Sequence, residues 1–72
     1  MAKIHIYFGT LSALDKILEV LDSNNIAYEV DHGYVELDEN DDIKDADGTI
    51  TISTSLAKYA AIKASIRKAA KA

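Results

Sequence analysis

The spacing of the hydrophobic residues switches between two periods along this chain, and this switching constrains the fold more than any other feature. Ile4, Ile6 and Phe8 occupy alternate positions, which is typical of a strand with one buried face. From residue 11 onward the apolar residues recur every three or four positions, which predicts an amphipathic helix over 11–23. Both periods return later in the chain, so the sequence predicts a domain that mixes strands and helices.

Short polar residues mark both ends of this first helix. Thr10 is a candidate N-cap, and the alternative is a capping box in which Ser12 pairs with Asp15. At the other end, Asn24 and Asn25 should stop the helix, because asparagine tolerates the left-handed backbone conformation that follows a helix C-terminus.

The middle of the chain predicts a hairpin followed by an acidic loop. Residues 26–31 and 34–38 each alternate apolar and polar side chains, and His32-Gly33 between them is a candidate tight turn. Residues 38–48 are polar and acidic apart from two positions, so we interpret them as a loop.

The last third of the chain predicts a short strand and a second helix. Ile50 and Ile52 alternate with threonine and serine over 49–53, and this β-branched composition favours a fourth strand. A helix is expected from Ser53-Thr54-Ser55 nearly to the end of the sequence. Its apolar stripe is predicted to contain Leu56, Tyr59, Ile62 and Ile66, continued by Ala69 and Ala70.

These elements predict a single small α+β domain over residues 1–72 with the order β-α-β-β-β-α. We expect a four-stranded, mainly antiparallel sheet with two helices on one face, because only one face of each strand is apolar. The opposite face should present polar and aromatic side chains to solvent: His5, Tyr7, Glu29, Tyr34, Glu36, Thr49 and Thr51.

Charge is divided sharply between two consecutive segments. Residues 29–47 hold nine acidic residues and one lysine, a net charge of −8, whereas residues 48–72 hold five basic residues and no acidic one. Fields of this strength steer association and select partners by charge. The net charge of the whole chain is −4, which argues against nucleic acid as the partner because the acidic half repels phosphate groups.

Composition removes several classes of function. The sequence has no cysteine, so it has no disulfide, no thiolate zinc site and no thiol redox chemistry. We expect neither a cofactor nor a structural metal. The first residues contain no apolar run of signal-peptide length, and no segment approaches the roughly 20 apolar residues of a membrane span. We therefore expect a cytoplasmic protein that does not enter the membrane.

One short string has the pattern of a calcium ligand loop. In Asp45-Ala46-Asp47-Gly48-Thr49-Ile50-Thr51, two acids precede a glycine and an isoleucine follows it two places later, which resembles the middle of an EF-hand loop. The sequence departs from that family at the first and last ligand positions, where Ile43 and Thr54 stand in place of carboxylates. An acidic loop closed by a glycine turn is the alternative interpretation.

Catalytic signatures are absent from the sequence pattern. His5 and His32 are the only histidines, and no nucleophile is spaced to pair with either of them. We interpret both as solvated or hydrogen-bonded surface residues, and we expect that the protein is not an enzyme.

The sequence is best interpreted as a protein–protein binding module that docks through an acidic hairpin and loop onto a basic surface of another protein. The small size and acidity suit an inhibitor or adaptor, such as a phage protein directed against a host nucleic-acid machine, CRISPR complexes included; this would place it in the host cytoplasm. Tyrosines among acids are a common interface composition. The expected contact residues are Tyr7, Glu29, Asp31, Tyr34, Glu36, Asp38, Glu39, Asp41 and Asp42.

Two alternatives remain open at the level of sequence. The last helix could bind nucleic acid through Lys63, Arg67 and Lys71, which are spaced four residues apart on one face. The chain could also self-associate, either by pairing its acidic and basic halves between copies or by extending the sheet at an unpaired strand edge.

Overall fold

The computed structural model describes residues 1–71 as three strands and two helices. In chain order these are β1 (Ala2–Phe8), α1 (Leu11–Ser23), β2 (Tyr28–Leu37), β3 (Ile43–Thr54) and α2 (Leu56–Ala70). The α+β class is confirmed, and α1 has the bounds expected from the sequence. The predicted four-stranded sheet is wrong, because the sheet has three strands.

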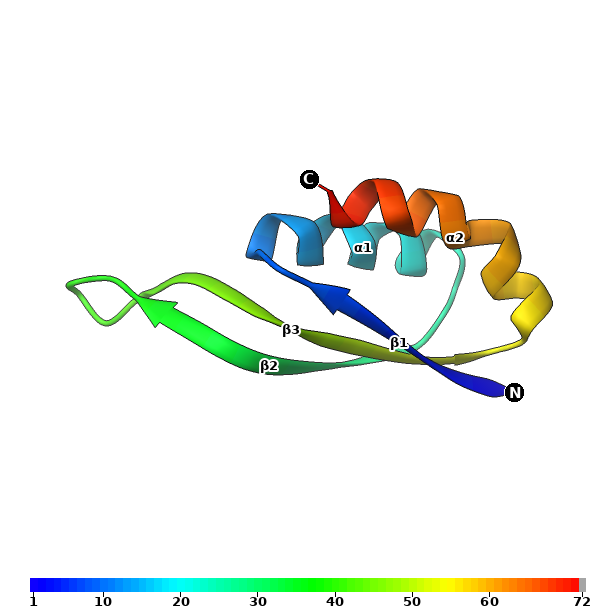
Figure 1. The fold of residues 1–72 in the computed structure, drawn as a ribbon, viewed down its shortest axis with the longest axis horizontal. Coiled ribbons are helices and arrows are strands. Elements are labelled where there is room, and N and C mark those ends of the chain that lie inside the picture. Colours follow the sequence, from blue (N-terminus) through cyan, green and yellow to red (C-terminus); the bar gives the residue numbers. More distant parts are fainter. Residues whose placement is uncertain (72) are drawn as a thin grey trace.

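Both helices lie over the same face of an antiparallel sheet (Figure 1). The strand order is β1-β3-β2, so the last strand of the chain occupies the centre and pairs with both neighbours. The register places Ile6 on one side of Ile50 and Val30 on the other. Helix α1 carries the chain from β1 across the sheet to β2, and α2 packs beside α1.

The predicted tight turn at His32-Gly33 is wrong, because β2 continues through it. The register with β3 shifts between His32 and Tyr34, so Gly33 is the extra residue of a β-bulge. The ring of His32 meets the ring of Phe8 edge-on, with centroids 6.0 Å apart, which holds this part of β2 against the end of β1. A glycine inside a strand pattern marks a bulge as readily as a turn, and here the bulge prevails.

The hairpin turns instead at residues 38–42. The Asp38 carboxylate accepts hydrogen bonds from the backbone N–H groups of Asn40 and Asp42, at 2.8 and 3.1 Å. The backbone N–H of Asp38 donates to the carbonyl of Asp42, and Asp41 has a positive φ of 62°. Aspartate and asparagine favour this kind of turn because their side chains bond nearby backbone groups.

The acidic loop predicted over 38–48 is also wrong, because its second part is the beginning of β3. The strand was hidden in the sequence by its small inward-facing residues, Ala46 and Gly48, which carry no strong apolar signal. A Cβ at Gly48 would collide with the backbone oxygen of Asp31 and the ring of Phe8, so the close approach of the three strands requires glycine there.

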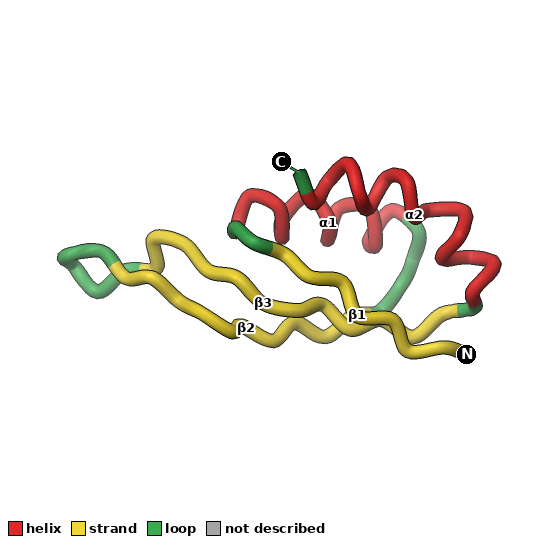
Figure 2. Tube along the Cα trace, viewed as in Figure 1, coloured by secondary structure: helices red, strands yellow, loops and turns green. Residues whose placement is uncertain are grey.

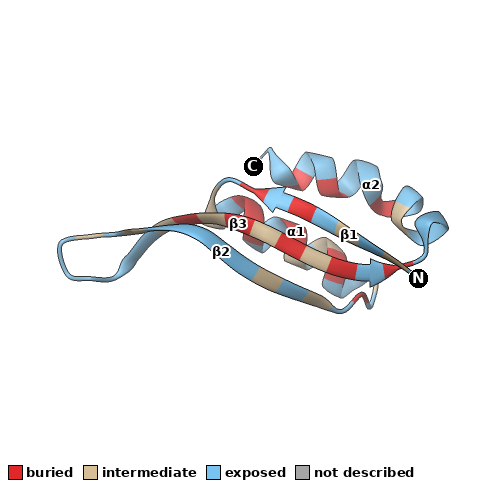
Figure 3. Cartoon of the chain, turned by 60° about the horizontal axis from the view of Figure 1, so that its bottom comes forward, coloured by how far each residue is buried: buried red, intermediate tan, exposed pale blue. Residues whose placement is uncertain are grey.

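The core lies between the sheet and the two helices (Figure 3). β3 supplies Ile50 and Ile52, both fully enclosed, and the inward residues of β1 pack beside them. The predicted stripe of α2 is confirmed in part, since Ile62, Ile66 and Ala69 are buried. Leu56 is 68% exposed instead, because the first turn of α2 lies past the end of α1 (Figure 1).

The helix ends confirm the capping expectations and decide between the alternatives. The Thr10 hydroxyl accepts a hydrogen bond from the N–H of Ala13 at 3.1 Å, so Thr10 itself is the N-cap of α1. At its other end Asn25 has a φ of 56°, and the N–H of Ile26 donates to the carbonyl of Leu21 in a Schellman arrangement. Ser55 caps α2 by accepting from the N–H of Lys58.

The hairpin extends well beyond the helices (Figures 1 and 2). β1 pairs only with residues 48–54 of β3, so residues 33–47 form a two-stranded segment with no third strand beside it. We call residues 33–47 the arm. It contributes to an elongated molecule with extents of 44 × 20 × 16 Å.

Candidate protein-binding surface

The face of the sheet that points away from the helices is polar, and no element of residues 1–71 covers it (Figure 1). We call this the outer face. His5, Tyr7, Glu29 and Tyr34 are exposed on it as the sequence predicted, while Thr49, Thr51 and Glu36 are half-buried. Cross-strand pairing aligns these side chains in rows, since Tyr7 and Asp31 flank Thr49 while His5 and Glu29 flank Thr51.

Two tyrosines of the outer face meet at one carboxylate, that of Asp47. One oxygen of Asp47 accepts the backbone N–H of Tyr34 at 2.8 Å, and the other lies 3.5 Å from the hydroxyl of Tyr7. The two side chains remain 59% and 65% exposed, in the order Tyr34 and Tyr7. Asp47 thereby joins a residue of the arm to a residue of β1, and it places both rings on one surface.

The acidic residues chosen from sequence fall into two groups. Glu29 and Asp31 are exposed on the outer face beside the tyrosines. Glu36 forms the one ion pair within 4.0 Å in residues 1–71, with Lys44 across the arm at 3.7 Å. Both partners of this pair are solvated, so it contributes little to stability.

The second group lies at the turn that ends the arm. Glu39, Asp41 and Asp42 are exposed there, whereas Asp38 is half-buried and uses one carboxylate oxygen to hold the turn. The structure therefore brings Glu39, Asp41 and Asp42 together as free charges, and it gives Asp38 mainly a structural role.

Asp45 has a different task from the other acids. Its carboxylate accepts the backbone N–H of Leu11, the first residue of α1, at 2.9 Å, and also the N–H of Ala46. These two hydrogen bonds lower the pKa of Asp45 below its usual range, with the bond from Leu11 the larger cause. Asp45 thus fastens the base of the arm to the start of α1.

The calcium-loop resemblance finds no support in the geometry. Asp45 and Asp47 lie in a strand, and their oxygens are engaged by backbone N–H groups. Within residues 1–71 no group of three or more histidine, cysteine, aspartate or glutamate side chains is arranged to hold a metal ion.

The two histidines occupy structural positions. His5 Nδ1 lies 3.0 Å from the hydroxyl of Thr51 on the outer face, and His32 packs against Phe8. Both side chains are exposed, as the sequence predicted.

The basic residues of α2 lie apart from the acidic arm. Lys63 and Arg67 of α2 and Lys71 at its C-cap are exposed, on a face that neighbours the buried stripe. None of them forms an ion pair with the arm in residues 1–71. No ion pair therefore joins the acidic segment to these basic residues within residues 1–71.

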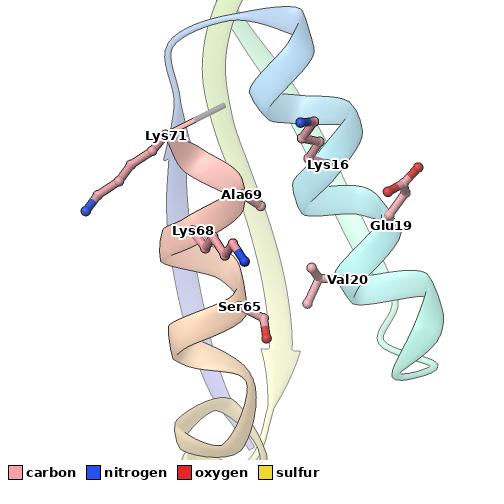
Figure 4. Close-up of a pocket in the computed structure, with 7 residues that line it drawn as sticks. All are labelled: Lys16, Glu19, Val20, Ser65, Lys68, Ala69 and Lys71. Carbon is pink, nitrogen blue, oxygen red and sulfur yellow. The ribbon is translucent and has the colours of Figure 1, made fainter.

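An open groove runs between the two helices (Figure 4). It has a volume of about 560 Å³, and Lys68 reaches into it from α2 while Lys71 points away. Lys16 and Glu19 of α1 line the facing side with opposite charges, so the groove offers no uniform field to a ligand.

No helix within residues 1–71 is long and apolar enough to cross a membrane.

Comparison with known proteins identifies no relative: no family model, curated protein or solved structure matches the chain.

Sequence reasoning missed Asp47, which organises the tyrosines, and it missed the exposed apolar residues of the arm. The pair Asp47-Gly48 is typical of a loop, whereas the alternation of Asp45, Asp47 and Thr49 indicates the strand that the structure has.

Proposed function

We propose that the protein is a non-enzymatic binding module that docks through the outer face and the turn of its arm onto a basic surface of another protein. The observation that carries this proposal is the surface built around Asp47, where two exposed tyrosines lie among carboxylates that form no ion pair within residues 1–71. Tyrosine supplies contact area at a small entropic cost, and the acids steer a positively charged partner into place.

The class of partner follows from the arrangement of charge. The acidic arm projects from the domain, so its carboxylates are able to enter a concave basic surface (Figure 1). Basic surfaces of that kind usually contact the phosphates of nucleic acids. We therefore propose a nucleic-acid-handling protein as the target, with inhibition by competition for its basic surface, as a phage inhibitor of a CRISPR complex would act.

The test is affinity capture from a lysate of the cells in which the protein occurs, after nuclease treatment and over a series of salt concentrations. A stoichiometric protein partner should remain after nuclease treatment and dissociate as salt rises. Replacing Glu29→Lys together with Asp31→Lys, or Tyr34→Ala alone, should reduce capture at least about tenfold, since charged and aromatic anchors commonly carry one to several kcal/mol.

The matched control is Lys63→Glu with Arg67→Glu, which reverses two charges on α2 and leaves the outer face intact. Capture of the protein partner should survive this change. Capture that does not depend on the outer face, or recovery of the bait alone, contradicts the proposal.

A second candidate function rests on the exposed basic side of α2. Lys63, Arg67 and Lys71 have no acidic partner in the described chain, so they are free to contact phosphate groups. Recovery of nucleic acid that is lost with the α2 control variant would favour this function over the first.

A further inference from the structure

The arm exposes apolar side chains on the face that continues the core. Val35 pairs with Ala46 of β3, which is buried on the same side as Ile50. Alternate residues of a strand share a face, so Leu37 lies on the same side as Val35. The register shifts between Glu36 and Leu37 and leaves Lys44 as an extra residue of β3, so Ile43, the partner of Leu37, lies on this side too. We call Val35, Leu37 and Ile43 the inner patch.

No element within residues 1–71 covers the inner patch. Both helices end over the three-stranded part of the sheet, and the arm extends past the start of α1 (Figure 1). The three side chains are 42%, 51% and 61% exposed, in the order Val35, Leu37 and Ile43. A β-branched and leucine surface on a projecting hairpin is unfavourable in water, so it calls for a partner.

We propose that the inner patch docks onto the outward side of α2 of a second copy of the chain, and that the two copies exchange this contact reciprocally. The outward side of α2 faces away from its buried stripe and contains Leu56, Ala60, Ala64 and Arg67, with Lys63 at its border and Lys71 at the C-cap, all exposed. Leu56 and the two alanines form an apolar strip along the helix, and the basic residues border it.

Charge complementarity identifies the second copy as the occupant. The arm holds seven acidic residues and one lysine, a net charge of −6, whereas residues 56–71 hold five basic residues and no acidic one. No ion pair joins these two regions within residues 1–71, because the one ion pair there lies inside the arm. Each copy therefore carries both an acidic, apolar projection and the basic, apolar surface that complements it.

Reciprocal exchange makes the contact isologous, so it closes as a dimer with two equivalent interfaces. This inference is independent of the proposed function, because the outer face with Tyr7 and Tyr34 lies on the opposite side of the sheet and stays free. The acidic residues of the turn lie next to both the outer face and the inner patch. Substitutions that distinguish the two proposals must therefore lie outside the turn, or their effect must be measured on self-association alone.

The test uses sedimentation velocity of three purified proteins. The first variant reverses three acids of the arm (Glu36→Lys, Glu39→Lys, Asp42→Lys), which changes the charge of residues 36–44 from −4 to +2. The second reverses three bases of α2 (Lys63→Glu, Arg67→Glu, Lys71→Glu), which changes residues 56–71 from +5 to −1. In the first variant residues 36–44 and the helix are then both positive, and in the second the arm and the helix are both negative.

The wild-type protein should sediment as a dimer at about 50 mM NaCl and shift toward monomer at about 500 mM, because salt screens the contact. Each variant alone should be monomeric. An equimolar mixture of the two variants should regain the dimer, since the positive residues 36–44 of the first variant then meet the negative helix of the second. The other arm and the other helix keep their native charges. Leu37→Ser with Ile43→Ser should weaken wild-type dimerisation about tenfold or more through lost apolar contact.

Reversing Asp15→Lys with Glu19→Lys on α1 is the matched control, and it should leave dimerisation unchanged. A wild-type protein that stays monomeric at about 200 μM in low salt overturns the inference, as that concentration exceeds the dissociation constant of a specific dimer. Variants that dimerise alone, or a mixture that remains monomeric, overturn it as well. If affinity capture recovers no protein partner although the protein forms the dimer, only the proposed function is contradicted.

Discussion

Single residues with unusual backbone conformations set the boundaries of this fold. Asn25 has a φ of 56° and ends α1, and Asp41 has a φ of 62° and closes the arm. Both residue types tolerate the left-handed region because their short polar side chains bond nearby backbone groups. The direction in which the chain leaves α1 toward β2 therefore depends on one exposed asparagine.

Asn25 offers a direct measurement of that dependence. Asn25→Ala should lower the free energy of unfolding by about 1 kcal/mol, because an L-residue with a Cβ is strained at positive φ. Asn25→Gly should be at least as stable as the wild type, since glycine has no such strain. Urea denaturation of the three proteins gives the comparison, and an alanine variant as stable as the glycine variant would show that backbone strain has no role here.

At the scale of elements, one hydrogen bond connects the arm to the helical layer. The Asp45 carboxylate accepts the N–H of Leu11 at the start of α1, and this bond lowers the pKa of Asp45. A carboxyl group whose pKa is lower in the folded state stabilises the fold above its ordinary pKa. That contribution is lost as the pH falls through the lowered value.

The expected result is a pH-dependent effect of Asp45→Asn. At pH 7 the substitution should lower the melting temperature by a few degrees. The difference from the wild type should shrink below about pH 4, where the unfolded chain binds a proton at Asp45 before the folded protein does. Thermal unfolding across pH 2–7 measures it, with Asp31→Asn as a control that removes an exposed carboxylate of the same charge. If the difference in melting temperature stays constant with pH, the effect of the substitution comes from the shape of the side chain and not from its charge.

The same elements show what the sequence could and could not reveal. Both helices were predictable, because their hydrophobic period is long and their caps, Thr10 and Ser55, use strong local signals. The arm was not, because Gly33 and Gly48 resemble turn residues and only pairing with distant strands decides that they lie in strands. The acidic residues of the proposed surface were visible as charge, yet the place of Asp47 between the two tyrosines depends on contacts across the sheet.

At the scale of the whole molecule, the arm makes the domain less compact than its length suggests. The radius of gyration is 12.9 Å, against about 11 Å for a compact domain of this length. The three-stranded part is covered by helices on one face, while the arm has only two strands and no core of its own. Two-stranded hairpins are marginally stable in water, so local stability should fall steeply along the hairpin.

Amide hydrogen exchange followed by NMR would map this gradient. The amides of Ile50 and Ile52 should exchange only through global unfolding, because they lie in the central strand under both helices. The amides of the arm should exchange faster by at least about tenfold, and high salt should accelerate them further if the dimer contact protects them. Equal protection along the whole of β3 would contradict the gradient.

The central place of β3 also has a consequence for synthesis on the ribosome. β1 and β2 bond only to β3, which follows both of them in the chain. Translation of its 12 residues takes roughly 1–2 s at ordinary elongation rates. During that interval the nascent chain has two finished strands without a mate, so the sheet must assemble in one late step, and chaperones that bind extended apolar segments have this time to engage it.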